Sequence, residues 1–377
     1  MLPRRLTSSQ AGTDTVADEG TTAVSMLAEH YDYVIGCDPD RDTIDLAVLE
    51  TASVGIRAHL AQTTDAAGYA RVLVWADEQA PGSRVWALEG TGNYGAGLAS
   101  FLAEAGEDVV EIDRVKRARR GGKNDQIDAV RAAREALSRD TQISPRQRGL
   151  REALRVVLTT RHAVLVSRTK AINELKALIV TAPEQLRGGL RGRPLTTQIA
   201  RIEQLHASAT STLEHRMTIF ALRSVAARIA FLTDQIDELD PQLAMLVHTH
   251  PAGSALLLEP GVGPVVAAQL LISWSHPGRV RSEAAFAALA GASPLEASSG
   301  QRARHRLNRG GDRALNRALH TVALTRLHCH PETRDYADRR TREGKTHREI
   351  KRCLKRSIAR RLYRRIQAAA PITSAAT

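Results

Sequence analysis

Short apolar runs bounded by turn residues occur five times in the first third of the chain, and each predicts a β-strand. The runs lie at residues 33–38, 43–49, 53–62, 84–89 and 108–112. Ala-rich amphipathic stretches predict helices at about 65–79, from Gly92 to about Ala105, and from Asp125 onward. Three strands precede the first helix and the later strands alternate with helices, so we expect an α/β domain with a mixed, partly parallel sheet.

In the middle of the chain the apolar residues take on the spacing of long helices. One helix is expected over residues 150–180. A second carries apolar residues alternately three and four apart from Leu222 to Leu246, the heptad pattern of a coiled coil. This seam could pack within the chain or against another subunit, and we favour a helical hairpin that also dimerises. We expect Pro241 to kink or restart the second helix, and residues 187–194 to form a basic, flexible joint.

The last third is expected to be mainly helical. Gly261-Val262-Gly263 before Pro264 predicts a helix-hairpin-helix, whose turn would offer backbone N–H groups to a phosphate, although an ordinary turn between helices would look the same. Further helices are predicted at about 308–326 and 346–367. The expected domains are a disordered tail (1–30), the α/β domain (31–145), a helical coiled-coil linker (146–250), a C-terminal domain (251–367) and a second disordered tail (368–377).

The distribution of charge along the chain indicates the kind of partner that it binds. The chain has 53 Lys and Arg against 41 Asp and Glu, and 21 of the basic residues but only 6 of the acidic ones lie between Arg302 and Arg365. A basic C-terminal third indicates a polyanion such as nucleic acid. The last predicted helix is either a nucleic-acid face or a solvated surface, and we favour the first. The predicted nucleic-acid-binding residues are Arg302, Arg304, Arg306, Lys351, Arg352, Lys355, Arg356 and Arg360.

Cysteine content and the apolar runs exclude several classes of protein. Three widely spaced cysteines support neither a disulfide framework nor a zinc site, and they fit a reducing cytoplasm. The first thirty residues lack a signal-peptide core, and no run has the roughly 18 apolar residues that a membrane helix needs. We therefore expect a soluble protein that is not exported.

Four carboxylates fall at the ends of predicted elements. Asp38 ends the first strand, Glu89 ends the fourth, and Asp125 and Asp128 open the helix that follows the fifth. If the first and fourth strands are parallel neighbours, the four could converge at the edge where open α/β sheets place their sites. Such a cluster needs a divalent cation, Mg²⁺ or Mn²⁺, for phosphoryl transfer or for gripping a phosphate. Taken singly, each residue could equally be a turn, strand-end or capping residue.

A serine pair offers a second kind of chemistry. Ser298 and Ser299 stand before Gly300 and several arginines, which have the parts for nucleophilic attack on a phosphodiester. By itself, Ser-Ser-Gly is a common loop sequence.

Together these motifs resemble the DEDD-type insertion-sequence transposases related to the Piv DNA invertase, which are bridge-RNA-guided recombinases. The resemblance covers about residues 31–365. The motifs that carry it are Gly36-Cys37-Asp38-Pro39-Asp40-Arg41-Asp42-Thr43-Ile44-Asp45, Leu88-Glu89-Gly90-Thr91-Gly92-Asn93-Tyr94, Lys123-Asn124-Asp125-Gln126-Ile127-Asp128-Ala129, Pro260-Gly261-Val262-Gly263, Gly291-x-x-Pro294 and Ser299-Gly300. Arg41, Asn124 and Asn316 depart from it, standing where the family commonly has Lys, Thr and Arg.

The resemblance implies a RuvC-like, RNase H-type N-terminal domain in which Asp38, Glu89, Asp125 and Asp128 bind Mg²⁺ or Mn²⁺. It implies that Ser299, or Ser298 if the register differs, links transiently to double-stranded DNA. A structured non-coding guide RNA would choose the sites, and a homodimer or homotetramer would carry out the reaction. The leading hypothesis is a transposase that moves its own element. The alternatives are a metal-dependent RuvC-like nuclease without serine chemistry and a non-catalytic nucleic-acid-binding protein.

Overall fold

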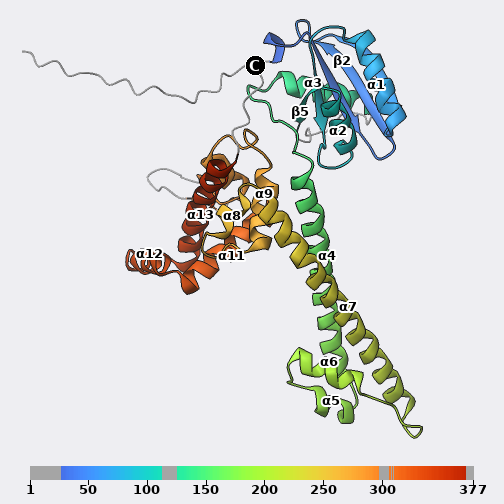
Figure 1. The fold of residues 1–377 in the computed structure, drawn as a ribbon, viewed down its shortest axis with the longest axis vertical. Helices are drawn as coiled ribbons and strands as arrows, with labels where there is room; N and C mark the ends of the chain where they lie inside the picture. The colour runs from blue at the N-terminus through green and yellow to red at the C-terminus, as the bar shows by residue number, and fades with distance from the viewer. Residues whose placement is uncertain (1–26, 113–124, 297–304, 307, 309, 371–377) are drawn as a thin grey trace, which may run out of the picture. The chain divides into compact units, whose positions relative to one another are not determined.

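The computed structural model describes residues 27–112, 125–296, 305, 306, 308 and 310–370 (Figure 1). The chain divides into two compact units, Met1–Pro145 and Arg146–Thr377. Most of the two predicted tails lies outside the described residues. Leu27, however, is buried in a short 3₁₀ helix, η1 (Leu27–Glu29), and the last helix continues to Ala369. No helix in the described part of the chain is long and apolar enough to cross a membrane.

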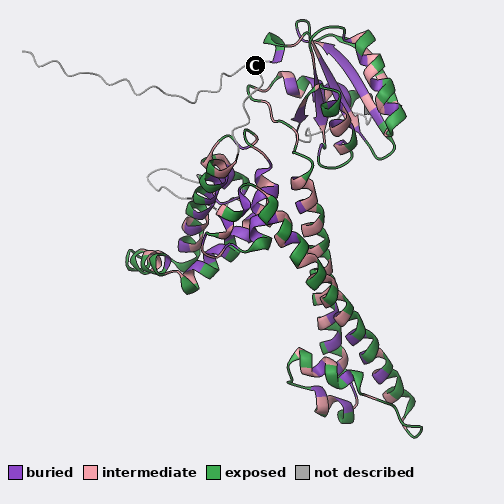
Figure 2. Ribbon diagram, in the orientation of Figure 1, coloured by how far each residue is buried: buried purple, intermediate pink, exposed green. Residues whose placement is uncertain are grey.

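The first unit is built on a five-stranded mixed sheet, as predicted. Its strands are β1 (Tyr33–Pro39), β2 (Thr43–Glu50), β3 (Ile56–Thr63), β4 (Arg84–Glu89) and β5 (Asp108–Ile112), in the spatial order β3-β2-β1-β4-β5. The first three strands pair antiparallel, whereas β4 pairs in parallel with both β1 and β5. The condition for bringing Asp38 and Glu89 together, that the first and fourth strands are parallel neighbours, is therefore met. Figure 2 shows the central strands as the buried centre of this unit.

Helices cover both faces of the sheet. On one face, α1 (Ala66–Gln79) and α2 (Ala96–Glu104) pack over apolar side chains that alternate along the strands, such as Ile35 and Cys37 of β1. On the other face, α3 (Asp125–Leu137) packs against the intervening positions, which include Val34 of β1. Because side chains alternate across a strand, the residues of β1 that face α3 are Val34, Gly36 and Asp38.

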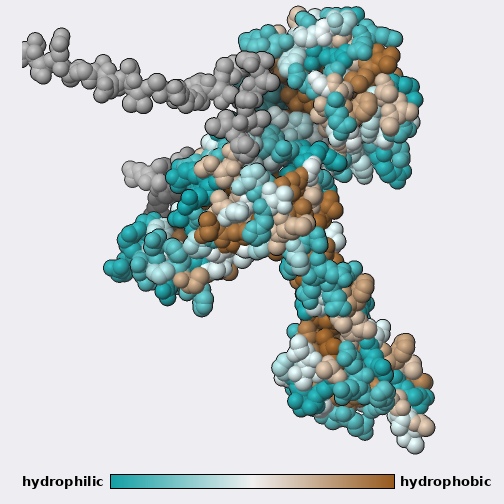
Figure 3. Space-filling model, viewed as in Figure 1, coloured by the Kyte–Doolittle hydropathy of each residue, from teal (hydrophilic) through white to brown (hydrophobic). Residues whose placement is uncertain are grey.

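The second unit contains a long antiparallel helical hairpin. It is formed by α4 (Leu150–Thr181), close to its predicted bounds, and α7 (Leu213–Thr249), which extends beyond the predicted Leu222–Leu246 seam at both ends. Pro241 does not restart α7, because one helix runs through it. The ion pair between Arg161 of α4 and Asp240 of α7 holds the two helices together beside the proline. Figure 3 shows hydrophobic side chains reaching the surface at several points along this hairpin.

The predicted flexible joint at 187–194 is helical in its first half, and residues 191–194 form the connection between two helices. Helix α5 (Glu184–Leu190) buries Leu186 and Leu190, and α6 (Leu195–Glu203) follows directly. Leu190 packs in one cluster with apolar residues of α4 and α7, so tertiary burial overrides the glycine-rich local sequence. These helices fill the far end of the hairpin.

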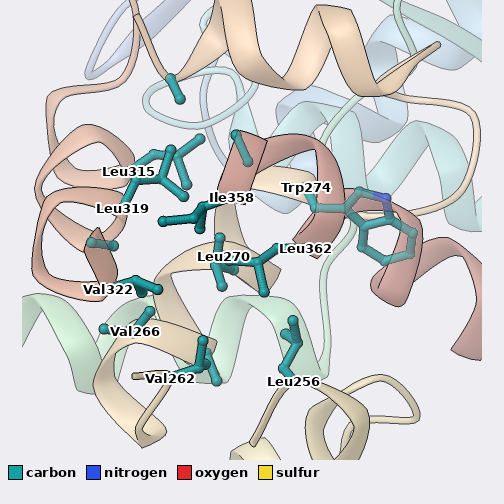
Figure 4. Close-up of a cluster of buried hydrophobic side chains, with 14 of the residues drawn as sticks. Leu256, Val262, Val266, Leu270, Trp274, Leu315, Leu319, Val322, Ile358 and Leu362 are labelled. Atoms are coloured by element: carbon teal, nitrogen blue, oxygen red, sulfur yellow. The ribbon is translucent and has the colours of Figure 1, made fainter. Parts of the chain in front are cut away.

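The rest of the second unit is a helical domain around one core. Its helices are α8 (Gly253–Leu257), α9 (Pro264–Trp274), α10 (Glu283–Leu289), α11 (Arg313–Cys329), α12 (Pro331–Arg342) and α13 (His347–Ala369). A two-residue pair of strands, β6 (Leu295–Glu296) and β7 (His305–Arg306), connects α10 to α11. Figure 4 shows how α9, α11 and α13 contribute side chains such as Leu270, Leu319 and Leu362 to one cluster.

Candidate functional site

Asp38 and Glu89 end neighbouring parallel strands in matching register. In the β1–β4 pair Cys37 lies opposite Leu88, so Asp38 and Glu89 are the next residues on the two strands. Both follow the alternation that points toward α3, because Val34 and Val85 of these strands belong to the α3-facing cluster. The sheet thus brings together two of the four predicted carboxylates at its carboxyl edge.

Helix α3 approaches this edge as closely as backbone allows. A Cβ atom on Gly36 would lie 2.0 Å from the carbonyl oxygen of Ala129 and 2.8 Å from the amide nitrogen of Ala133. The C-terminal turn of α3 packs near η1 and Tyr31, before the start of β1. Its N-terminal turn, which carries Asp125 and Asp128, therefore points toward the end of β1.

A third carboxylate joins the pair on the sheet. Asp45 of β2 lies directly opposite Asp38 in the antiparallel β1–β2 ladder, so the two side chains stand on the same face. Like charges directly opposite each other destabilise a sheet. Asp45 belongs to the first quoted motif, but no role was predicted for it. The register of the β1–β2 hairpin, which depends on a turn of uncertain length, is the signal that would have found it.

The two helix carboxylates are less fully placed. Asp128 is half-buried, and its Oδ1 accepts a hydrogen bond of 2.6 Å from Nη1 of Arg131 one turn later. Asp125 begins α3, but its side chain lies outside the described residues, as does the basic segment 113–124 before it. Among the side chains that the structure describes, no three His, Cys, Asp or Glu residues close up into a metal-holding group.

The loop after Glu89 ties the two strand ends together. Gly90 adopts a positive φ of 68°, and its carbonyl accepts hydrogen bonds from the amides of Asn93 and Gly95. A Cβ on Gly95 would meet the carbonyl of Glu89 at 2.7 Å and Cγ of Pro39 at 3.1 Å. This glycine loop therefore serves close packing of the strand ends.

The negative charge of Asp38 affects the neighbouring thiol of Cys37. Burial raises the pKa of the Cys37 thiol well above its ordinary value, and the neighbouring negative charge of Asp38 raises it further. Cys37 points to the opposite face of the sheet and remains a neutral thiol there. Carboxylates gathered on adjacent strands fit a hard divalent cation such as Mg²⁺ or Mn²⁺ by the chemistry of the donor set.

In the second unit, the predicted nucleophile lies outside the described residues. This holds for Ser298 and Ser299, for Arg302 and Arg304, and for the side chain of Arg306. What the structure describes is the base of the segment that carries them. Leu295 and Glu296 pair with Arg306 and His305 as β6 and β7, so both ends of the segment are joined.

The base of this β6–β7 hairpin is closely packed. A Cβ on Gly291 would lie 2.7 Å from the carbonyl of Gly310, and one on Gly311 would lie 2.3 Å from the carbonyl of Leu289. The amide of Asp312 donates to the same Leu289 carbonyl at 2.7 Å, and its carboxylate caps α11. The glycine of the Gly291-x-x-Pro294 motif is thus explained by the meeting of the segment's two ends.

The basic residues of α13 fall into two groups. Arg360 and Arg364 form ion pairs with Glu283, and Arg361 and Arg365 pair with Glu259. The N-terminal half of the helix differs. Within the described part of the chain, no Asp or Glu lies within ion-pair distance of the following residues: Lys351, Arg352, Lys355 and Arg356. Of the predicted nucleic-acid-binding residues on α13, only Arg360 has its charge matched by a carboxylate.

Glu259 organises the turn before α9. Its carboxylate is 2% exposed and also bonds Nη2 of the buried Arg326 at 3.1 Å, while Nε of Arg326 donates to the carbonyl of Pro260 at 2.8 Å. Burial pushes the pKa of Glu259 upward, but the hydrogen bonds from Arg365 and Arg361 outweigh it, and the net pKa is lowered. The turn is therefore clamped to α11 and α13.

Comparison with known families covers both units. Residues 35–182 match a family model for the DEDD transposase of IS110 elements, and residues 254–338 match the model described as "Transposase IS116/IS110/IS902 family". The first match contains Asp38, Glu89, Asp125 and Asp128, and the second contains Ser299.

Individual relatives agree with these matches. An uncharacterized protein of insertion element IS110 from Streptomyces coelicolor is 34% identical over 33% of this chain and 31% of its own length. The transposase for insertion sequence element IS1328 from Yersinia enterocolitica is 26% identical over 59% and 65%. An uncharacterized protein of IS900 from Mycobacterium paratuberculosis is 24% identical over 85% and 88%. The chain thus spans about a third of the first of these relatives and most of the last.

Proposed function

Because the chain belongs to the DEDD transposases of IS110-type insertion sequences, we propose that it is a site-specific DNA transposase that cuts and rejoins double-stranded DNA. The observation that carries this proposal is the matched register of Asp38 and Glu89 at the carboxyl ends of β1 and β4. With α3 packed onto Gly36 of the same strand, this arrangement supports the proposal that carboxylates so far apart in sequence act in one site.

In this proposal Asp38, Glu89, Asp125 and Asp128 hold Mg²⁺ or Mn²⁺. A bound divalent cation would neutralise these carboxylates and stabilise negative charge on the oxygens of a DNA phosphate. The chain's own part is to fix the carboxylates on rigid elements. The strand register fixes Asp38 and Glu89, and the close contact at Gly36 fixes the first turn of α3.

Ser299 is the proposed nucleophile, with Ser298 as the alternative. Its hydroxyl oxygen attacks a backbone phosphorus, forms a phosphoserine ester and releases the hydroxyl of the departing DNA strand. Attack on that ester by a DNA hydroxyl reverses the chemistry and rejoins the strand. Positive charge for the phosphate comes from Arg302, Arg304 and Arg306, and from the part of α13 whose charges are not matched by carboxylates.

The proposal includes a structured guide RNA and a homodimer or homotetramer. The unmatched basic residues of α13 suit the phosphates of either nucleic acid. Apolar side chains exposed along the α4–α7 hairpin, among them Val166, Phe220 and Phe231, suit a contact with a second subunit. RNA dependence is tested by measuring site-specific DNA binding with and without the element's transcript. Binding that is unaffected by RNA would remove the guide from the proposal.

The central test is covalent trapping. Incubation with end-labelled DNA carrying an element terminus, followed by denaturing electrophoresis, should show a protein–DNA adduct that Ser299→Ala abolishes. Asp38→Asn should reduce the adduct, whereas Ser53→Ala, in the β2–β3 turn at the opposite end of the sheet, should not. If free, metal-dependent DNA ends accumulate without an adduct, the chain is a metal-dependent nuclease instead. If neither product forms and DNA is still bound, it is a binding protein.

A further inference from the structure

Two helices of the second unit present a group of polar and basic side chains to each other at the base of the β6–β7 hairpin. Asn316 and His320 lie one turn apart on α11, and Lys351 and Lys355 lie one turn apart on α13. Nζ of Lys355 donates a hydrogen bond of 2.9 Å to Oδ1 of Asn316. Each pair therefore forms one face of its helix, and the two faces meet.

Asn316 links this group to the hairpin. Its Nδ2 donates to the carbonyl of Ala290 at 2.6 Å, and Ala290 directly precedes Gly291, where the two ends of the hairpin segment meet. Lys355, which is half-buried, is thus held by one side chain at the root of the segment that carries the predicted nucleophile. An amide that accepts from a lysine cannot neutralise it, so the hydrogen bond fixes the position of Nζ and leaves its charge available.

The surroundings are positive on both helices. Burial lowers the pKa of His320, and the charges of Lys355 and Lys351 lower it further. Burial and the charge of Arg352 likewise lower the pKa of Lys355. The charges that cause these shifts show that His320, Lys351, Arg352 and Lys355 interact electrostatically.

Nearby acids are already engaged. Asp312, one turn before Asn316, accepts from Ser273 and from the first amides of α11. Glu349 closes the capping box of α13 with Thr346. A site that gathers like charges without a matching carboxylate is suited to an anion with several oxygens, and a DNA phosphodiester is such an anion.

We propose that Lys355, held by Asn316 and flanked by His320 and Lys351, binds a phosphodiester oxygen at the base of the β6–β7 hairpin and positions the DNA backbone for reaction. This inference rests on the proposed function and assigns different roles to the basic residues of α13. Lys355 orients the phosphate at a fixed point, whereas the exposed Arg352 and Arg356 contribute affinity along the backbone.

The first test separates charge from structure at Lys355. Lys355→Gln keeps a donor for Asn316 but removes the charge, and Lys355→Arg keeps the charge. We expect Lys355→Gln to slow adduct formation at saturating DNA by about 100-fold while changing the DNA dissociation constant by less than about threefold. Lys355→Arg should recover most of the rate. Arg364→Gln, which removes an exposed charge that already pairs with Glu283 on the same helix, is the matched control and should keep the wild-type rate.

Equal rates for Lys355→Gln and wild type would overturn the inference and leave the proposed function intact. A wild-type protein that forms no adduct would instead refute the proposed function, and then a second measurement decides about the phosphate site. The C2 proton of His320, assigned among the 13 histidines by its loss in His320→Gln, is titrated by NMR with and without inorganic phosphate.

Phosphate bound at Lys355 should raise the pKa of His320, because an anion favours the protonated imidazole. The rise should disappear in Lys355→Gln. A pKa that does not respond to phosphate in the wild type, or that responds equally in Lys355→Gln, would refute a phosphate site at this position whatever the catalytic result.

Discussion

Replacing Gly36 by Ala tests whether the contact between β1 and α3 builds the acidic site. The added Cβ would lie 2.0 Å from the Ala129 carbonyl oxygen, whereas ordinary contact begins at 3.4 Å. Helix α3 must then retreat by on the order of 1 Å or tilt, because the atoms it meets are main-chain atoms that cannot turn aside. Overpacking of this kind costs about 3 kcal/mol of unfolding free energy.

The same displacement of α3 should disturb the predicted metal site. Asp125 and Asp128 lie on the helix that moves, while Asp38 and Glu89 stay on the sheet. Metal coordination tolerates errors of only a few tenths of an ångström, so the affinity for Mn²⁺ should fall by at least about tenfold, which corresponds to about 1.4 kcal/mol. Urea denaturation gives the first quantity, and calorimetric titration with Mn²⁺ below the unfolding transition gives the second.

Leu102→Ala is the matched control for this experiment. Leu102 is fully buried on the opposite face of the sheet, and its truncation should cost about 2–5 kcal/mol without moving α3. We expect it to lose stability and keep Mn²⁺ affinity. If Gly36→Ala binds Mn²⁺ as tightly as the wild type does, α3 does not contribute ligands, and the reasoning from Gly36 to the site fails.

Three further predictions concern the charged groups. Glu259→Gln should cost about 3–5 kcal/mol in urea denaturation because it leaves buried Arg326 without its carboxylate, whereas Arg365→Gln, at a half-exposed position, should cost less than about 1 kcal/mol. The folded pKa of Glu259 lies below its ordinary value of 4.5, so the stability that its carboxylate contributes is present above pH 4.5 and is lost as the pH falls through the folded pKa. The wild type should therefore lose more unfolding free energy between neutral and acid pH than Glu259→Gln loses. Mn²⁺ at about 100 times its dissociation constant should stabilise the wild type by about 2.7 kcal/mol in thermal melts and Asp38→Asn much less. An equal gain in stability in Asp38→Asn would contradict the last point.

The sheet could be predicted from sequence because its signals are local. Each strand is a short apolar run ended by turn residues, and β5 was predicted at its observed bounds. Parallel pairing of β1 with β4 was only a condition in the sequence analysis, and the structure meets it, which places Asp38 beside Glu89. Asp45 could not be found in this way, since its position opposite Asp38 depends on the register of a hairpin.

Predictions that depended on distant partners were less successful. The glycine-rich run at 187–194 reads locally as a joint, but Leu186 and Leu190 find a buried surface on α4 and α7. Pro241 reads as a break, yet packing along the hairpin carries the helix through it. In both cases tertiary burial supplies more free energy than the local preference opposes.

The basic C-terminal third shows why a count of charges does not locate a binding surface. Arg360, Arg361, Arg364 and Arg365 lie on the same helix as Lys351 and Lys355, and nothing in the local sequence separates the two groups. Glu259 and Glu283, far earlier in the chain, separate them by matching the later group. A charge that already pairs with a fixed carboxylate gives less net attraction to a phosphate than an unmatched charge does. Among the described residues, the unmatched positive charge of α13 therefore lies in its first half, beside Asn316 and the base of the β6–β7 hairpin, and we expect nucleic acid to bind there.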